Sequence, residues 1–168
     1  AGSGNNVTLD NSGNDFTGAF TIVSGNDVSI RDTNALALAA STITGDLTLQ
    51  TGGNLTQTGA LEVNGATSIT AGSNDVTLNN SSNDFTGAVT IVSAGETDFA
   101  TSGDMSLAGF TLDDDRTFTA NGDLTLTGDI TKSSGGDATL TLKADDSIIF
   151  NTNVDITSTS NKLNTILW

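Results

Sequence analysis

The chain has 168 residues, a formal net charge of −15, and no proline, cysteine, histidine or tyrosine. With only five Lys and Arg, it lacks the clustered cations that nucleic acids and anionic membrane surfaces require. The absence of cysteine excludes disulfides and thiolate metal sites. No apolar run approaches the roughly 18 residues of a transmembrane helix. We interpret the many acidic residues as a solvated coat that keeps the protein soluble.

Short pulses of apolar residues recur from the N-terminus onward, each with Thr or Ser between two apolar positions. This period of two is typical of strands with one buried and one wet face. Gly, Asn and Asp, the residues of turns, fill the intervals. The clearest pulses are Val7–Leu9, Val28–Ile30, Leu47–Leu49, Val76–Leu78, Met105–Leu107 and Leu124–Leu126.

The spacing of the strands is close. We expect strands to begin near Leu47, Leu55, Leu61, Ser68 and Val76, and gaps this short leave no room for crossover helices. The short segment 35–40 (ALALAA) also alternates, so we predict strand there too. Three strands would then recur about every 19 to 23 residues, which is typical of one coil of a β-solenoid.

A long internal duplication supports a solenoid. Residues 5–24 and 74–93 are identical at 16 of 20 positions, and both contain NDFTGA. If the offset between the copies is a whole number of coils, it equals three coils of about 23 residues. We therefore predict that Phe16 and Phe85 lie on the same face three coils apart. The Asn residues at equivalent positions of the two copies, which are Asn5 and Asn74, and Asn14 and Asn83, are expected to belong to amide ladders along the turns. An antiparallel sandwich is the alternative, although its strands are usually spaced more widely.

Several motifs resemble a known family of proteins. NDFTGAVTI, the recurring GDLTL of 45–49 and 122–126, and the stretch 136–165 (GDATLTLKADDSIIFNTNVDITSTSNKLNT) are similar to the shaft repeats of filamentous haemagglutinin-type adhesins. These adhesins are exported by two-partner secretion. The resemblance implies an all-β, right-handed parallel β-helix, here of seven to eight coils. It also implies secretion to the cell surface of a Gram-negative bacterium.

The domain organisation expected is a single β-helix segment over residues 1–168, part of a longer chain. No signal peptide precedes Ala1, and the family's NPNG-like secretion signals do not occur. The resemblance transfers no binding residues, because shaft repeats are not the usual seat of specificity.

Acidic clusters are the candidates for chemistry. Some β-helices are polysaccharide lyases or hydrolases, which need converging carboxylates. Asp113–Asp115, followed by Arg116, is the densest cluster, and Asp145–Asp146 is similar. Consecutive strand residues point to opposite faces, so we interpret both clusters as solvated turns, and we expect no enzyme, catalytic residue or cofactor. A weak calcium site near Asp113–Asp115 stays open, although no GGxGxDxUx repeat occurs.

The most direct interpretation is a non-catalytic shaft segment of a bacterial surface adhesin. Two alternatives are a self-assembling extracellular filament and, less favoured, a carbohydrate-binding β-helix. The expected partners are neighbouring coils, other copies end to end, and host or matrix glycans. An ice-binding face is disfavoured, because its Thr-x-Thr motifs are irregularly spaced. We expect the aromatic residues to stack in the core; they are Phe16, Phe20, Phe85, Phe99, Phe110, Phe118 and Phe150.

Overall fold

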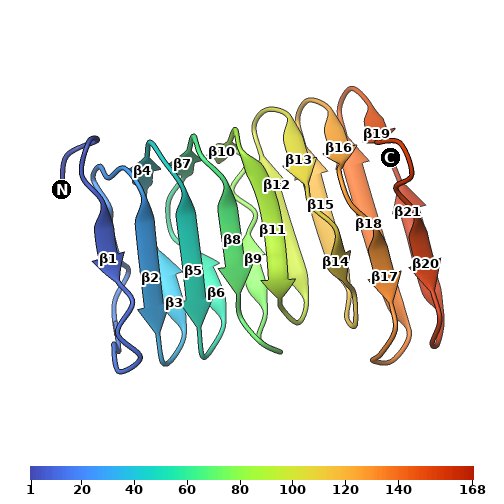
Figure 1. Cartoon of the computed structure of the whole chain (residues 1–168), viewed down its shortest axis with the longest axis horizontal. Helices are drawn as coiled ribbons and strands as arrows, with labels where there is room; N and C mark the ends of the chain where they lie inside the picture. The colour runs from blue at the N-terminus through green and yellow to red at the C-terminus, as the bar shows by residue number, and fades with distance from the viewer.

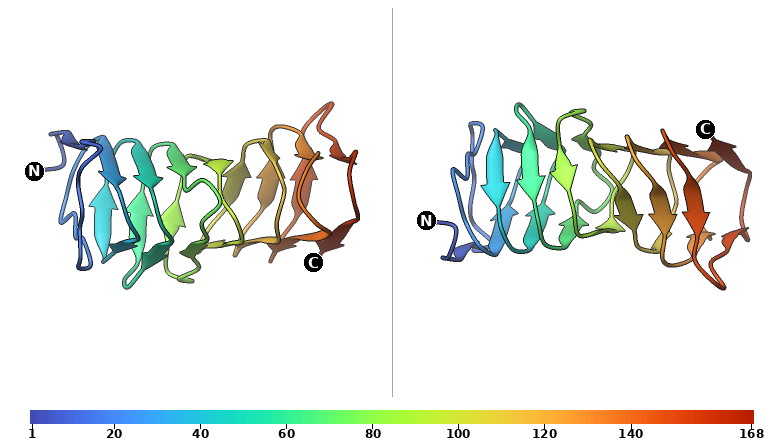
Figure 2. Two further views of the ribbon diagram at one scale, coloured as in Figure 1. Left: turned by 90° about the horizontal axis from the view of Figure 1, so that it is seen from below. Right: turned by 90° about the horizontal axis from the view of Figure 1, so that it is seen from above.

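Twenty-one short strands stack into an elongated rod in the computed structural model, which describes residues 1–168 (Figure 1). Every strand pairing is parallel, so the antiparallel sandwich is excluded. The chain winds from one end of the rod to the other, and its termini lie at opposite ends (Figure 2). The fold is a parallel β-solenoid, as the sequence predicts.

Two long sheets run along the whole rod. Sheet A has eight strands, one for each coil. Its members are β1 (Val7–Leu9), β2 (Val28–Asp32), β5 (Leu47–Thr51), β8 (Thr67–Thr70), β11 (Ala88–Ser93), β13 (Met105–Leu107), β16 (Leu124–Leu126) and β19 (Ile148–Phe150). Sheet B has seven strands, which are β3 (Leu36–Leu38), β6 (Leu55–Gln57), β9 (Val76–Leu78), β12 (Thr97–Thr101), β15 (Arg116–Ala120), β18 (Ala138–Ala144) and β21 (Leu163–Leu167).

The third side of the rod is divided between two short sheets. Sheet C lies between B and the next strand of A, and comprises β4 (Ser41–Ile43), β7 (Leu61–Val63) and β10 (Asp84–Phe85). Sheet D lies between A and B, and comprises β14 (Phe110–Thr111), β17 (Ile130–Lys132) and β20 (Ile156–Ser158). The chain order in a coil is therefore A, B, C in the N-terminal half and A, D, B in the C-terminal half.

The coils are mostly shorter, and less regular, than the duplication predicts. Within sheet A the shortest coil leads from Val89 to its register partner Leu107, and the longest leads from Leu126 to Phe150. The strands themselves match the expectation: β5, β6, β7 and β9 begin at the predicted residues, β8 begins one residue early, and β3 occupies the ALALAA segment.

The core follows directly from the alternation. Inward positions form one continuous cluster of 32 buried residues, in which equivalent side chains of successive coils stack on one another. For example, Val28, Leu47 and Thr67 occupy one column of sheet A, each at most 1% exposed. Removing such side chains from water is the main stabilising term. The structure contains no helix that is long and apolar enough to cross a membrane.

A glycine at the corner before β11 permits close stacking of two coils. A Cβ atom built on Gly87 would overlap the backbone oxygen of Gly65 and lie 2.7 Å from the nitrogen of Ala66. The equivalent residue in the first copy, Gly18, has no atom within 4 Å of such a Cβ atom.

We therefore expect Gly87→Ala to lower the free energy of unfolding by roughly 2 kcal/mol, because the backbone of the preceding coil must move. Gly18→Ala is the matched control and should change it by less than about 0.5 kcal/mol. Urea denaturation of the two variants checks this. Equal effects would show that stacking is not the reason for the glycine.

Candidate functional site: charged turns, an edge groove and the duplicated corner

The densest acidic cluster forms the turn between β14 and β15, as predicted. Asp113 Oδ1 lies 3.7 Å from Arg116 Nη2. The Asp114 carboxylate accepts a hydrogen bond from the backbone amide of Asp115. The Asp115 carboxylate accepts one, at 2.7 Å, from the backbone amide of Thr139 in the next coil. The three carboxylates therefore have separate partners and do not converge. No group of three or more acidic side chains in the structure is placed to hold a metal ion.

The second acidic pair lies in the turn before β19. Asp145 and Asp146 are exposed, and their amides donate to the carbonyl oxygens of Ala120 and Gly122 in the preceding coil. Their solvated position agrees with the sequence interpretation.

Other turn carboxylates share one structural role. Each accepts the backbone amide of the equivalent turn in the next coil: Asp27 from Asp46, Asp46 from Ala66, Asp104 from Asp123, and Asp129 from Asp155. The distances between nitrogen and oxygen are 2.8 to 3.1 Å. At a corner the ladder of the sheet is interrupted, so a side chain must satisfy the amide. Much of the acidity is therefore structural as well as solvating.

Arg116 is not part of the solvated turn. It is the first residue of β15, points inward in register with Thr97 and Leu140, and is 1% exposed. Its Nη2 donates to the carbonyl oxygen of Ala94 at 2.8 Å, and its guanidinium lies 4.8 Å from the ring centre of Phe110. Its Nε and Nη1 are buried without a hydrogen-bond partner. Burial lowers the pKa of Arg116, while Asp113 and Asp114 act in the opposite direction.

A hydrophobic side chain of similar size should suit this position better. We expect Arg116→Met to leave the free energy of unfolding unchanged or raise it by up to about 2 kcal/mol, because it removes an incompletely paired buried charge. Arg116→Ala should instead lower it by roughly 2–4 kcal/mol, because it leaves a cavity. Thermal unfolding of both variants tests this, and a loss for Arg116→Met comparable to that for Arg116→Ala would show that the guanidinium stabilises the fold.

Lys132 is a second buried cation that the sequence interpretation missed. It is 0% exposed, and its Nζ donates to the carbonyl oxygen of Ser134 at 2.6 Å. The alternation of buried and exposed positions could have indicated both buried cations. Lys132 lies two residues after the inward-facing Ile130, and Arg116 lies two residues before the inward-facing Phe118, so each is expected to face inward too. Two of the five cations thus lie inside the rod near the Asp113–Asp115 turn.

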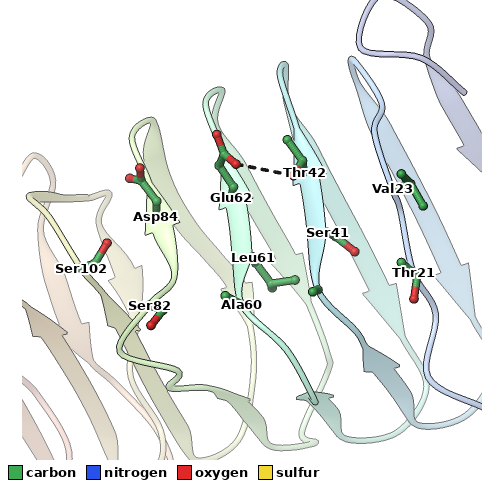
Figure 3. A pocket seen from close by; sticks show the side chains of 11 residues that line it. Thr21, Val23, Ser41, Thr42, Ala60, Leu61, Glu62, Ser82, Asp84 and Ser102 are labelled. Carbon is green, nitrogen blue, oxygen red and sulfur yellow. Dashed lines mark hydrogen bonds between the residues drawn. The ribbon is translucent and has the colours of Figure 1, made fainter.

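An open groove of about 530 Å³ follows the outer face of sheet C (Figure 3). Thr42, Glu62 and Asp84 project outward from successive strands of this sheet, and Thr42 Oγ1 lies 3.5 Å from Glu62 Oε2. Val23, 84% exposed, lies at one end. The lining contains hydroxyls and carboxylates but no aromatic ring, the usual platform for a sugar.

The corner containing the second NDFTGA is organised by Asn83. This side chain is 0% exposed and lies between β9 and β10. Its Oδ1 accepts the amide of Leu61 at 2.9 Å, and its Nδ2 donates to Leu78 O at 3.0 Å and Ala100 O at 3.2 Å. It also exchanges hydrogen bonds with the Gln57 amide. Asn83 therefore connects three successive coils.

The first copy makes the same local bonds. Asn14 Nδ2 donates to Leu9 O at 2.9 Å and Arg31 O at 3.2 Å, the equivalents of Leu78 O and Ala100 O. In both copies the backbone amide of this Asn also donates to the backbone carbonyl oxygen three residues earlier. Its backbone carbonyl oxygen accepts a hydrogen bond from a backbone amide of the following coil. The sequence thus encodes a local corner, which consists of a strand, a wide loop, and an Asn whose side chain donates hydrogen bonds to backbone carbonyl oxygens around the loop.

The two corners lie on different sides of the rod, so the prediction of a shared face is wrong. β1 is in sheet A whereas its copy, β9, is in sheet B. Phe16 lies where the chain turns from A towards B, above Asp32, whereas Phe85 is in sheet C. Asn14 and Asn83 accordingly form no common ladder.

The reason is the number of extended segments between the two copies. Two positions between β1 and β2 pair with the next coil: Phe20 bridges Leu38 in sheet B, and Gly25 bridges Ile43 in sheet C. Together with β1 to β8 these two segments make ten before β9 begins, whereas three full coils require nine. The offset therefore advances the chain by three coils and on to the next sheet.

A third, divergent copy of the corner lies at the C-terminal end. Residues 151–157 (NTNVDIT) follow a short strand as residues 80–86 (NSSNDFT) do, and the Val154 amide donates to Asn151 O as the Asn83 amide donates to Asn80 O. Val154 replaces the buried Asn, and Ile156 replaces Phe85.

This recurring corner agrees with a comparison with known families. Residues 1–23 and 25–92, more than half of the chain, match the family model described as repeats of unknown function (DUF5649). The chain belongs to this family. The two matches end at Val23 and Val92, which are equivalent positions of the duplication. No curated protein matches the chain, and no solved structure matches it.

The end of the second DUF5649 match coincides with a switch in the cross-section of the rod. From β2 to β11, the strands of sheet A have four to six residues and those of sheet B have three. From β12 onward, sheet B has strands of five to seven residues and sheet A has strands of three. The third side passes from sheet C to sheet D at the same place. The second DUF5649 match therefore ends where the long strand moves from sheet A to sheet B.

Aromatic side chains cluster at this switch. The ring centres are 4.6 Å apart for Phe85 and Phe99, 6.3 Å for Phe99 and Phe118, and 5.5 Å for Phe110 and Phe118. These large rings fill the core where sheet C gives way to sheet D. The expectation that aromatic residues stack in the core is confirmed for these four. Phe16 and Phe20, 5.1 Å apart, are only half-buried against the core, and Phe150, in the last coil, is 40% exposed.

Proposed function

We propose that the chain is a non-catalytic shaft segment of a large adhesin of the filamentous haemagglutinin type. In this proposal the parent protein is secreted by the two-partner route and displayed on a Gram-negative bacterium. The resemblance of the GDLTL segments and of residues 136–165 to shaft repeats of that family supports the proposal. The role is mechanical: the shaft holds a distal region away from the cell.

The observation that carries the proposal is the continuity of sheets A and B. Both run through the coils without a break, even where the third side changes from C to D. Each coil adds about 4.8 Å, the spacing of neighbouring strands, so eight coils extend roughly 35–40 Å. Because each coil contacts only its neighbours, adding units lengthens such a rod without a new core design.

The turn carboxylates fit this role. They satisfy the corner amides and also cover the rod with negative charge, which favours solubility of an elongated protein. The Asp113–Asp115 turn is explained in the same way, because its carboxylates have backbone or Arg116 partners.

Surface labelling of the bacterium that encodes the chain tests the proposal. Antibodies raised against the folded chain should label intact cells, and deletion of a neighbouring outer-membrane pore gene should abolish the labelling. Antigen found only after cell lysis, in both strains, would refute the proposed display and export.

A further inference from the structure

The groove on the outer face of sheet C runs along the axis of the rod (Figure 3). Its lining comes from five successive coils, which contribute in turn Val23, Thr42, Glu62, Asp84 and Ser102. At about 4.8 Å for each coil, these residues span roughly 20 Å. The groove is therefore long and narrow, and its shape suits a thin, linear ligand.

Two carboxylates stand side by side in this groove. Glu62 of β7 and Asp84 of β10 are register partners, and both project outward (Figure 3). No other register pair in the four sheets places two side chains of the same charge opposite each other. Like charges in this arrangement destabilise a sheet. The pair therefore weakens the rod unless a positive charge compensates it.

The chain itself provides no such compensation. The single ion pair of the structure lies elsewhere. The Glu62 carboxylate has one weak contact, at 3.5 Å from Thr42 Oγ1, and the Asp84 carboxylate accepts no hydrogen bond from the chain. Turn carboxylates such as Asp46 and Asp104 differ, because each accepts a backbone amide of the next coil. Glu62 and Asp84 thus lack the structural role that explains other acidic residues of the rod.

The accessible apolar part of the lining consists of small side chains. Ala40 and Ala60 directly precede β4 and β7, and both are half-buried. Because each has only a methyl group, a ligand can come close to the backbone there. Together with the exposed Val23, these methyl groups offer an apolar surface beside the two carboxylates.

We propose that this groove binds a linear polyamine. Neighbouring ammonium groups donate to Glu62 and Asp84, and the methylene groups between them lie against Ala40 and Ala60. The short methylene chains of a polyamine separate its ammonium groups by a distance comparable with the spacing of neighbouring strands, about 4.8 Å. Binding would remove the repulsion between the carboxylates and form charge-assisted hydrogen bonds. This site goes beyond the proposed shaft and does not depend on surface display.

A polyamine suits the groove better than a metal ion or a sugar. Calcium and magnesium need about six or more oxygen ligands, and no group of three acidic side chains is placed to hold a metal ion. The groove also lacks an aromatic ring on which a sugar could stack. The net charge of −15 favours the approach of a cationic ligand from solution.

Titration calorimetry with spermidine tests the site, at about 0.15 M salt so that long-range attraction to the acidic surface is screened. The unmodified chain should bind one spermidine saturably, and the double variant Glu62→Gln with Asp84→Asn should bind it roughly tenfold or more weakly. The matched control is Asp145→Asn with Asp146→Asn, which removes the same charge from an exposed turn and should leave the affinity unchanged. No saturable binding, or an equal loss in both double variants, would overturn the proposal.

Thermal unfolding supplies an independent readout. Without ligand, Glu62→Gln with Asp84→Asn should unfold at the same temperature as the unmodified chain or a higher one, because the repulsion is gone. Spermidine should raise the melting temperature of the unmodified chain and not that of this variant. A variant that is less stable without ligand would show that the pair is structural. Displacement of spermidine by an equal concentration of calcium would likewise contradict a polyamine site, whereas failed surface labelling would refute only the adhesin shaft.

Discussion

Replacing Phe99 with alanine is expected to lower the free energy of unfolding by about 3–5 kcal/mol. Phe99 is 0% exposed and lies between Phe85 and Phe118, so its ring connects three coils at the switch from sheet C to sheet D. The neighbouring coils cannot collapse into the space, because sheets A and B hold them at the strand spacing. Urea denaturation followed by circular dichroism measures the loss.

Phe150→Ala is the control for this substitution. Its ring is 40% exposed in the last coil, so it should cost about 1 kcal/mol or less. If Phe99→Ala were no worse than Phe150→Ala, the aromatic cluster would have no special part in the switch.

Asn83→Ala should cost about 3 kcal/mol, although the side chain is small, because several buried groups lose their partner at once. The substitution leaves the amide of Leu61 and the carbonyl oxygens of Leu78 and Ala100 without this hydrogen bond. Each unsatisfied buried group costs roughly 1–3 kcal/mol, reduced where water can enter.

Asn14→Ala tests the same sequence motif in a more open setting. Asn14 is only half-buried and bonds Leu9 O and Arg31 O, with no third coil to connect. We expect a loss of about 1 kcal/mol. Equal losses for the two variants, measured by thermal unfolding, would mean that the corner acts only locally.

Much of the fold could be predicted from the sequence because the strands follow a period of two. Leu47, Leu55, Leu61 and Val76 begin strands as expected, since each opens an alternation of apolar and polar residues after a turn that contains Gly, Asn or Asp. The parallel solenoid followed from gaps too short for helices. The length of each coil could not be predicted, because long and short strands have the same composition and differ only in how many residues they contain.

The placement of the duplication could not be predicted for a related reason. Residues 5–24 and 74–93 fold into the same corner on different sides of the rod, and their hydrogen bonds involve the adjacent coil wherever it lies. A local motif therefore carries no information about which sheet it joins. The sheet that the second copy joins depended on whether Phe16 to Val23 forms one strand or two, and the sequence left this open.

The charged turns were predictable in position and not in detail. Asp113–Asp115 forms the expected turn, yet Arg116 beside it points into the core. Its phase with Phe118 indicated this, but an arginine is rarely buried without full pairing, so composition favoured the solvated interpretation.

The central claim is that one duplicated unit carries the chain from sheet A to sheet B. Spin labels on two cysteine pairs test it most directly by dipolar broadening in electron paramagnetic resonance. The first pair is Thr8 and Ser68, which lie three coils apart in sheet A, a separation of about 14 Å at the strand spacing. The second pair is Thr8 and Thr77, its equivalent in the duplication, which lies in sheet B.

We predict strong broadening for Thr8 and Ser68 and little for Thr8 and Thr77, because the labels of the second pair lie on different sides of the rod. Strong broadening for Thr8 and Thr77, with little for Thr8 and Ser68, would place the duplicated segments on one face and contradict the switch between sheets.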